Sequence, residues 1–205
     1  MNNSHITTII FDYGGVLLEW NPHNVYHRYF PGQPEAIDQF LTEINFAEWN
    51  AQQDKGRPFA EAVESISAEF PHYAHLISAY YEYWEESITG SIPGSIEILK
   101  ELKDKKYPLY GLSNWSHETF PIARDKYDFF ELFDDMVISG EVKMVKPDPA
   151  IFEHALNKFG KRASECVYID DSLTNVQQAQ KMGFHAIHFQ SPAQLRESLQ
   201  RLELL

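Results

Sequence analysis

Four apolar stretches of the sequence each end in, or are closely followed by, a polar residue that could take part in chemistry. These residues are Asp12, Ser113, Lys146 and the pair Asp170-Asp171. Each has an ordinary explanation: aspartates are common in turns, a serine can cap a helix, and a lysine can be a solvated surface charge. Because the carboxyl ends of parallel strands meet at one edge of an open α/β sheet, four such coincidences indicate instead a single site at that edge.

The predicted site carries an excess of negative charge, which predicts a bound cation. Three carboxylates beside one lysine repel one another, and their natural counterion is a hard divalent cation with oxygen ligands, such as Mg²⁺. With a cation present, Asp12 could attack phosphorus and form an aspartyl-phosphate, which water would then hydrolyse. Ser113, the Asn114 amide and Lys146 would hold the phosphoryl oxygens as charge is redistributed.

The overall composition excludes several classes of protein. The chain has 205 residues, of which 43% are hydrophobic, as expected for one sizeable core with a smaller subdomain. Its 17 basic and 30 acidic residues give a formal charge of −13, which argues against nucleic acid or an anionic membrane as a partner. The single cysteine, Cys166, and the absence of a signal peptide or a long apolar run predict a cytoplasmic protein.

Strands that alternate with helices predict an α/β fold with a doubly wound, Rossmann-like parallel sheet. After the first apolar run, which ends at Asp12, buried strands are predicted at residues 109–112, 136–139, 167–169 and 186–189. Helical patterns separate these runs, and a final helix contains Leu195, Leu199 and Leu202.

The segment between the first strand and the rest of the predicted sheet has apolar residues at helical spacing. Amphipathic helices are predicted at residues 37–44, 59–70 and 76–88. We therefore predict an inserted all-helical subdomain at residues 18–89 and an α/β core formed by residues 1–17 and 90–205.

The residues at the predicted strand ends resemble the motifs of the haloacid dehalogenase superfamily, whose members are aspartyl-nucleophile hydrolases. The matching segments, in chain order, are Phe11-Asp12-Tyr13-Gly14-Gly15-Val16, Leu112-Ser113-Asn114, Lys146-Pro147-Asp148, and Ile169-Asp170-Asp171-Ser172 with Asn175. Their order and spacing match over almost the whole chain, and the helical insert is similar to the family's cap. The paired aspartates also resemble those of sugar-phosphatase members such as α-glucose-1-phosphate phosphatase.

This resemblance implies roles for the residues that carry it. Asp12 would be the nucleophile, and Mg²⁺ would be held by Asp12, the backbone carbonyl of Gly14 and Asp171, with Asp170 nearby. The substrate would be a small phosphorylated metabolite, for which a sugar phosphate is one example. The cap would close over the substrate and exclude water.

One position departs from the pattern of most phosphatases in this family. They carry a second aspartate two residues after the nucleophile, which protonates the leaving oxygen, whereas this chain has Gly14. General acid catalysis contributes about 10²–10⁴-fold to the rate, so the departure predicts slow turnover or a better leaving group. Glu19, His23 and His117 are candidates for a substitute acid, although each is also a residue type common on protein surfaces.

Two other functions are compatible with the sequence. Haloacid dehalogenases of the same superfamily also lack the second aspartate, use no metal, and bind a substrate carboxylate with arginines, for which the insert offers Arg28 and Arg57. Against this, two like charges 4 Å apart cost roughly 4 kcal/mol at an effective dielectric of 20, so the Asp170-Asp171 pair disfavours a metal-free site for an anion. The third hypothesis is a binding protein that kept the fold and lost the reaction.

Other residue clusters have more ordinary interpretations. The aromatic stripe Tyr80, Tyr81, Tyr83 and Trp84 could line a sugar site, but such a stripe more often forms helix core. The pairs His72/His75 and His185/His188 have no third metal ligand at suitable spacing, so we interpret them as structural or surface residues.

Overall fold

A parallel five-stranded sheet forms the centre of the molecule and confirms the predicted α/β fold class. The computed structural model describes residues 6–205. The strand order is β5-β4-β1-β6-β7, and every neighbouring pair is parallel. The strands are β1 (Thr8–Phe11), β4 (Leu109–Ser113), β5 (Asp135–Ile138), β6 (Cys166–Asp170) and β7 (His185–His188). Each lies within about two residues of an apolar run that predicted it.

The central strand β1 is buried on both faces, which explains its continuous apolar sequence. Successive side chains of a strand point to opposite sides of the sheet. Accordingly, Ile9 and Phe11 belong to one hydrophobic core and Ile10 belongs to a second core on the other side. All three side chains are fully buried. Asp12 follows immediately, so the edge of the sheet at which β1 ends is fixed by two hydrophobic cores.

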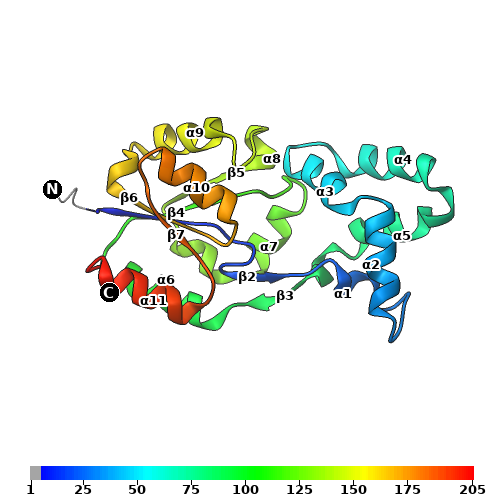
Figure 1. Cartoon of the computed structure of the whole chain (residues 1–205), viewed down its shortest axis with the longest axis horizontal. Helices are drawn as coiled ribbons and strands as arrows, with labels where there is room; N and C mark the ends of the chain where they lie inside the picture. Colours follow the sequence, from blue (N-terminus) through cyan, green and yellow to red (C-terminus); the bar gives the residue numbers. More distant parts are fainter. Residues whose placement is uncertain (1–5) are drawn as a thin grey trace.

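Helices cover both faces of the sheet (Figure 1). The pair α6 (Pro93–Asp104) and α11 (Pro192–Arg201) packs on one side, and α9 (Pro149–Phe159) and α10 (Leu173–Lys181) pack on the other. The smaller elements of this part are α7 (Phe120–Lys126), η3 (Asp128–Leu132), α8 (Ser139–Val142) and η4 (Ala163–Glu165). Among residues 6–205, none of the helices has the length and apolar character required to traverse a bilayer.

Local sequence signals fix the ends of the helix that follows Lys146. Asp148 caps the start of α9, where its side chain accepts a hydrogen bond of 2.9 Å from the backbone N–H of Ala150. Pro149 occupies the first helical position, where its missing N–H is not needed. The helix ends at Gly160, whose φ of +64° is the left-handed conformation typical of a helix terminus. The segment containing Lys146 is thus held between α8 and a firmly capped helix.

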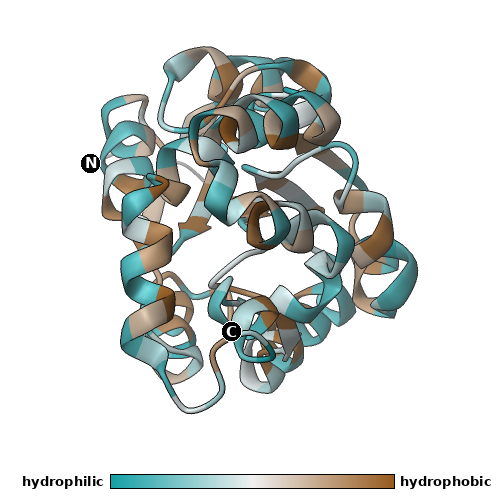
Figure 2. Cartoon of the chain, turned by 90° about the vertical axis from the view of Figure 1, so that its right-hand side faces the viewer, coloured by the Kyte–Doolittle hydropathy of each residue, from teal (hydrophilic) through white to brown (hydrophobic). Residues whose placement is uncertain are grey.

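The segment between β1 and α6 forms a separate group of helices, which we call the helical part. Its elements are α1 (His23–Tyr26), α2 (Pro34–Glu43), α3 (Phe46–Asp54), α4 (Phe59–Glu69), η1 (Pro71–Tyr73), α5 (Ala74–Glu82) and η2 (Trp84–Ser87). Figure 1 shows it to one side of the sheet, and Figure 2, viewed from that side, shows hydrophobic and hydrophilic residues alternating around the helices. The predicted helices at 37–44, 59–70 and 76–88 correspond to α2, α4 and α5, but α5 ends at Glu82 and Ile88 lies in a strand. The sequence did not predict α1 or α3.

Two short strands connect the helical part to the sheet, and the sequence analysis did not predict them. They are β2 (Leu18–Trp20) and β3 (Ile88–Ser91), which pair antiparallel with an irregularity between Glu19 and Trp20. The predicted boundaries at residues 17/18 and 89/90 fall at this ribbon. Each strand is too short to show a clear alternation of apolar and polar residues, which explains why the sequence pattern did not reveal it.

Candidate active site

The structure brings the predicted chemical groups together at one edge of the sheet. Asp12 follows β1 directly, Ser113 is the last residue of β4, and Asp170 is the last residue of β6. Asp171 comes next in the chain, and Lys146 reaches the same edge from the loop between α8 and α9. Because these strands are parallel neighbours in the sheet, their carboxyl ends are adjacent, as the sequence predicted.

Lys146 is the cation at the centre of this group. Its Nζ lies 2.9 Å from Asp12 Oδ2 and 2.7 Å from Asp170 Oδ2, and it donates to the carbonyl oxygen of Leu112 at 2.9 Å. The residue is only 4% exposed. Burial alone would lower the pKa of Lys146, but the carboxylates of Asp12 and Asp170 raise it above its ordinary value. Lys146 therefore stays charged and holds two carboxylates in place.

Asp12 is positioned from both sides by hydrogen bonds. Its Oδ1 accepts from the hydroxyl of Ser113 at 2.7 Å and from the backbone N–H of Tyr13 at 2.7 Å. Burial and the neighbouring Asp170 raise the pKa of Asp12, while Lys146 and Ser113 lower it, and the resulting pKa is about 7. A second cation at this site would favour the ionised carboxylate, which is the form that can act as a nucleophile.

The two adjacent aspartates differ in how their side chains are used. Oxygen atoms of Asp170 accept hydrogen bonds from the side chains of Lys146, Tyr168 and Asn175 and from the backbone N–H of Ser172. Asp170 is completely buried, whereas Asp171 is exposed and lines a cavity. The carboxylate of Asp170 is thus held by four hydrogen-bonding partners, whereas Asp171 lines the cavity.

A set of carboxylate oxygens at this edge could hold a metal ion. One oxygen from each of Asp12, Asp170 and Asp171 lies within 4.8 Å of the others. Hard divalent cations bind such oxygen ligands, together with water and substrate phosphate. The donor set therefore fits Mg²⁺, as the sequence predicted.

The two glycines after Asp12 have different roles. Gly14 lines the cavity, and a Cβ atom added there would meet no atom within 4 Å. Gly15 has a φ of +71°, and a Cβ atom there would lie 2.2 Å from Asp171 Oδ2. Only glycine at position 15 lets the carboxylate of Asp171 lie beside the backbone that follows Asp12.

We expect Gly15→Ala to lower the affinity for Mg²⁺ by displacing Asp171. The left-handed backbone at this position also adds strain of order 1–2 kcal/mol for a residue with a Cβ atom. Isothermal titration with Mg²⁺ measures the first effect and urea unfolding the second. Gly14→Ala is the matched control, since it adds the same atom in open space. Equal Mg²⁺ affinity in the two variants would contradict the role given to Gly15.

The side chain of Asn114 contacts the backbone of Lys146, and the role of its amide toward phosphoryl oxygens stays a prediction. Its side-chain Nδ2 donates to the carbonyl oxygen of Lys146 at 3.0 Å, and its Oδ1 accepts from the backbone N–H of Lys146 at 2.8 Å. This pair of hydrogen bonds fixes the backbone that carries Lys146. Asn114 also lines the cavity.

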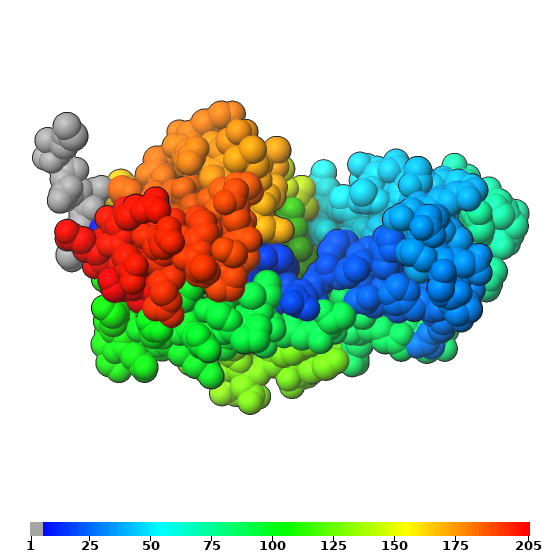
Figure 3. All heavy atoms as spheres, turned by 60° about the horizontal axis from the view of Figure 1, so that its bottom comes forward, coloured from blue at the N-terminus to red at the C-terminus, as the bar shows by residue number. Residues whose placement is uncertain are grey.

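A cavity of about 260 Å³ lies where the helical part meets this edge of the sheet. On the sheet side it is lined by Asp12, Gly14, Gly15, Ser113, Asn114, Trp115, Ser116, Thr119 and Asp171; the other lining residues are Trp20, Asn50, Asp54, Phe59, Tyr80, Trp84 and Ile88. Figure 3 shows an indentation between the two parts, bordered by the N-terminal segment in blue and by later residues in orange.

None of the three predicted substitutes for the missing acid lines this cavity. Glu19 is exposed on β2 and accepts a hydrogen bond from Thr89, and His23 pairs with Asp38 at 3.2 Å. His117 is partly buried but lies outside the lining residues. These three suggestions from the sequence are therefore not supported by the geometry.

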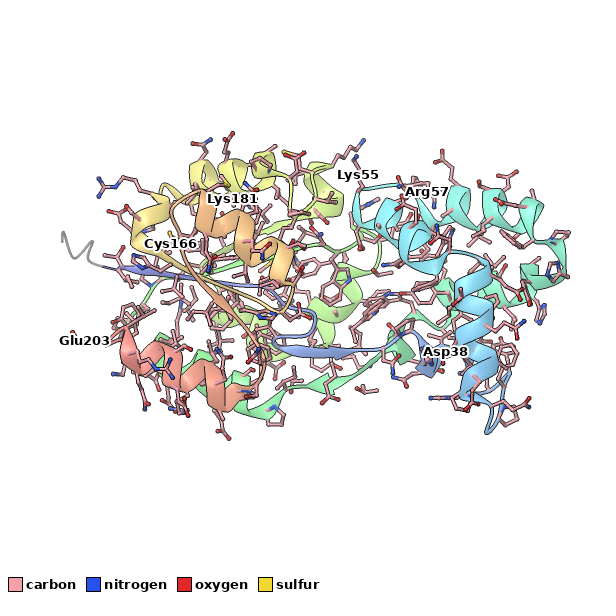
Figure 4. All side chains as sticks on the ribbon, viewed as in Figure 1. Asp38, Lys55, Arg57, Cys166, Lys181 and Glu203 are labelled. Carbon is pink, nitrogen blue, oxygen red and sulfur yellow. The ribbon has the colours of Figure 1, made fainter. Side chains whose placement is uncertain are left out.

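The two arginines that a dehalogenase would need also lie away from the cavity. Arg57 donates from Nε to Gln53 at 2.8 Å and lines a different hollow, on the helical part. Arg28 pairs with Glu86 and lies over the ring of Tyr83. Figure 4 labels Arg57 beside Lys55, near the edge of the helical part.

An acid that the sequence analysis missed does line the cavity. Asp54 is the last residue of α3, and burial raises the pKa of its carboxyl to about 7, while Lys146 and the backbone amide of Ser116 lower it. Because it lies next to Lys55, in a polar stretch of sequence, Asp54 has the sequence signature of a solvated charge. Gly56, two positions later, was the one sign in the sequence that the turn after Asp54 could contact another part of the chain.

The aromatic stripe divides between core and cavity. Tyr80 and Trp84 are buried and line the cavity, whereas Tyr81 is 44% exposed and Tyr83 is partly buried beneath Arg28.

The histidine pairs differ in their surroundings: His72 and His75 contact aromatic rings of the helical part, whereas His188 contacts the backbone of Asp171. His72 packs on Tyr73, and His75 contacts Tyr29. His188 lies 2.9 Å from the backbone oxygen of Asp171.

Comparison with known proteins identifies the class to which this fold and site belong. A profile of the haloacid dehalogenase-like hydrolases matches residues 6–183. The chain therefore belongs to this family of hydrolases. Among solved structures, a HAD family enzyme from Bacteroides thetaiotaomicron in complex with magnesium and inorganic phosphate superimposes with a TM-score of 0.69 at 25% identity, covering 91% of this chain and 95% of that one.

The curated relatives include both phosphatases and a dehalogenase. Sesquiterpene phosphatase astK from Aspergillus oryzae is 27% identical over 183 residues, which is 87% of each chain. Drimenol cyclase drtB from Aspergillus calidoustus is 24% identical over 95% of this chain, which spans only 36% of the cyclase. (S)-2-haloacid dehalogenase 4A from Burkholderia cepacia is 27% identical over 55% of this chain and 46% of its own length.

Proposed function

We propose that this protein is a Mg²⁺-dependent phosphatase that hydrolyses a small phosphate monoester through an aspartyl-phosphate on Asp12. The observation that carries the proposal is that Asp12 and Asp171 line one cavity and that Lys146 is paired with the Asp12 carboxylate. A buried carboxylate, positioned by hydrogen bonds beside a group of metal-binding oxygens, is suited to nucleophilic attack on phosphorus.

The cation would be held by the residues that the sequence indicated. We assign Asp12, the backbone carbonyl of Gly14 and Asp171 as ligands, with Asp170 adjacent and supporting. When bound, Mg²⁺ supplies the positive charge that lets a phosphate dianion approach three carboxylates. A chain with a net charge of −13 needs such a cation to hold an anionic substrate.

In the proposed reaction Asp12 attacks phosphorus, and the bond from phosphorus to the leaving oxygen breaks. Ser113 and Lys146, which already contact the Asp12 carboxylate, stabilise the phosphoryl oxygens. Water then attacks the aspartyl-phosphate, restores the carboxylate of Asp12 and releases inorganic phosphate. The helical part, residues 18–89, would act as the cap that excludes bulk water.

The lining of the cavity favours an uncharged organic group on the substrate. Its wall contains Trp20, Phe59, Tyr80, Trp84 and Trp115, and no Lys, Arg or His side chain is among the lining residues of the described chain. Aromatic faces bind apolar groups and the apolar faces of sugars, whereas a second phosphate would find no basic partner in this wall. The substrate is therefore the monophosphate of an apolar alcohol or of a sugar, and astK is named for a substrate of the first kind.

The alternative is the metal-independent 2-haloacid dehalogenase, which the dehalogenase relative keeps open. Two observations weigh against it. The carboxylate group at the site repels an anionic haloacid in the absence of a metal, and Arg28 and Arg57 do not reach the cavity. A binding protein without catalysis is disfavoured by the intact hydrogen bonding of Asp12.

Hydrolysis of p-nitrophenyl phosphate, with Mg²⁺ and after chelation, tests the proposal beside chloride release from L-2-chloropropionate. We expect nitrophenolate release that requires Mg²⁺, and no chloride. Chloride release without metal and without phosphatase activity would identify a dehalogenase. Absence of both activities would favour the binding role.

The buried free thiol of Cys166 is consistent with the cytoplasmic location that we also propose.

A further inference from the structure

The missing acid leaves a gap in the proposed reaction. Without a proton donor, the leaving oxygen of an alkyl phosphate departs as a strongly basic alkoxide. Cleavage of its bond to phosphorus is therefore slow. Position 14, where most phosphatases of the family carry the acid, is glycine. A donor must therefore come from elsewhere, or the enzyme must be restricted to weakly basic leaving groups.

Only a few side chains are placed to supply this proton. Among the described residues that line the cavity, the carboxylates are those of Asp12, Asp54 and Asp171. Asp12 is the nucleophile and Asp171 lies in the metal-binding group. Burial raises the pKa of the remaining acidic hydroxyl, that of Tyr80, which makes it a poor donor near neutral pH. Asp54 is the carboxyl that is left.

We propose that Asp54, from the helical part, is the general acid and base of this enzyme. The inference rests on the proposed phosphatase function. In this proposal the proton donor comes from the helical part, whereas the nucleophile comes from the end of a strand of the sheet. A cavity of about 260 Å³ brings both groups within reach of one bound ester.

The position of Asp54 is fixed by contacts with the sheet part. Ser139, the residue after β5, donates from its hydroxyl to the carbonyl oxygen of Asp54 at 2.5 Å. The same hydroxyl accepts from the backbone N–H of Trp115 at 2.9 Å, so it links the end of α3 to the segment after β4. The side chain of Asn50 donates to Asp54 Oδ2 at 3.3 Å. Asp54 is thus held at the interface and does not project into solvent.

Two glycines allow this close contact. Gly56 has a φ of +98°, and a Cβ atom there would lie 2.9 Å from the carbonyl oxygen of Gly140. A Cβ atom at Gly140 would lie 2.5 Å from the backbone nitrogen of His117. Side chains at either position would separate the turn after Asp54 from the sheet part.

The proton transfers balance over the two steps. In the first, Asp12 forms a bond to phosphorus, the bond to the leaving oxygen breaks with its electron pair, and that oxygen takes the proton of Asp54. In the second, water forms a bond to phosphorus, its proton passes to the Asp54 carboxylate, and the bond from phosphorus to Asp12 breaks. The enzyme returns to its initial protonation state.

The acid must carry its proton before the first step, which sets the pH dependence. A pKa raised to about 7 keeps a large share of Asp54 protonated near neutral pH. The groups around it are Lys146, which lowers its pKa, the Tyr80 hydroxyl, and the carboxylates of Asp12 and Asp171 in the same cavity. For an alkoxide leaving group, kcat/KM should therefore fall as pH rises through the pKa of Asp54.

The test compares Asp54→Asn with the unsubstituted protein on two aromatic esters of similar size. Benzyl phosphate has a strongly basic leaving group, and p-nitrophenyl phosphate has a weakly basic one that needs no proton. We expect kcat/KM for benzyl phosphate to fall by about 10²-fold or more. The first-turnover burst of nitrophenolate should persist, followed by slow turnover because the second step lacks its base. The decline of benzyl phosphate activity at high pH should disappear.

Two further variants separate catalysis from structure. Glu19→Gln removes the charge of an exposed carboxylate outside the cavity. It should leave both activities and the pH profile unchanged. Because position 14 has open space, Gly14→Asp in the Asp54→Asn protein should restore part of the benzyl phosphate activity.

The outcomes that would overturn the proposal are distinct from failure of the phosphatase function. If Asp54→Asn slowed the first turnover of both esters equally, or slowed neither, Asp54 would not be the general acid, and the phosphatase would stand. If the unsubstituted protein with Mg²⁺ hydrolysed neither ester, the phosphatase function would fall and the role of Asp54 with it.

Discussion

Asp12→Asn is expected to reduce phosphate ester hydrolysis by about 10⁴-fold or more, since it removes the proposed nucleophile, on which both steps of the proposed reaction depend. Asparagine has nearly the same shape, and its carbonyl oxygen can still accept from Ser113 and from the backbone of Tyr13. The fold should therefore be retained. Steady-state kinetics measures the first effect, and circular dichroism with thermal unfolding checks the second.

The matched control for this variant is Asp38→Asn, which makes the same chemical change at an exposed residue of α2. Asp38 is labelled in Figure 4 beside α2, and its substitution should leave the activity unchanged. Substantial phosphatase activity in Asp12→Asn, after removal of any unsubstituted enzyme, would rule out the aspartyl-phosphate on Asp12.

Lys146→Met is expected to have the largest effect on stability. It leaves the buried carboxylates of Asp12 and Asp170 without their shared cation. Loss of one partner from a buried ion pair typically costs about 3–5 kcal/mol in the free energy of unfolding. The activity should fall as well, because Lys146 positions Asp12 and would neutralise phosphoryl charge.

The pH dependence of Lys146→Met gives a stricter test. Without the lysine, the pKa of Asp12, already raised by burial, rises further, and the pKa of Asp170, which Lys146 helps to hold below its ordinary value, rises as well. The folded variant therefore binds more protons than its unfolded state. Stability relative to the unsubstituted protein should then recover as pH falls toward about 4. Urea unfolding at several pH values measures this. The control is Lys181→Met, which replaces an exposed lysine at the end of α10. Figure 4 labels this residue. A constant deficit across pH would contradict the shared-cation role.

The sheet could be predicted from the sequence because its strands are buried on both faces. Such strands are continuous apolar runs, and the residue after each run marks the edge where side chains converge. Asp12, Ser113 and Asp170 were found in this way, and topology brought them together. The same reasoning could not predict the hydrogen bonds that hold the Asp170 carboxylate, or that Asp171 rather than Asp170 lines the cavity.

The cap-side half of the site could not be predicted, because it depends on contacts between distant segments. The backbone of Asp54 is held at the sheet part by Ser139, which lies 85 positions later in the chain. A short helix such as α3, with Phe46 and Trp49 as its large buried side chains, has too few apolar residues to show a helical period. Apolar periodicity predicts which face of a helix or strand is buried. It does not predict which polar residue at the end of that element contacts a distant part of the chain.

In the proposed phosphatase, the β2–β3 ribbon would link substrate preference to movement of the helical part. The chain crosses between the two parts only at this ribbon, whose pairing is irregular between Glu19 and Trp20, so any movement of the helical part would use the ribbon as its hinge. Yet Trp20 and Ile88, one from each strand, also form part of the cavity wall. A substitution at either position that reshapes the wall for a different alcohol will also change the stiffness of the hinge, so selectivity and the rate of product escape will change together.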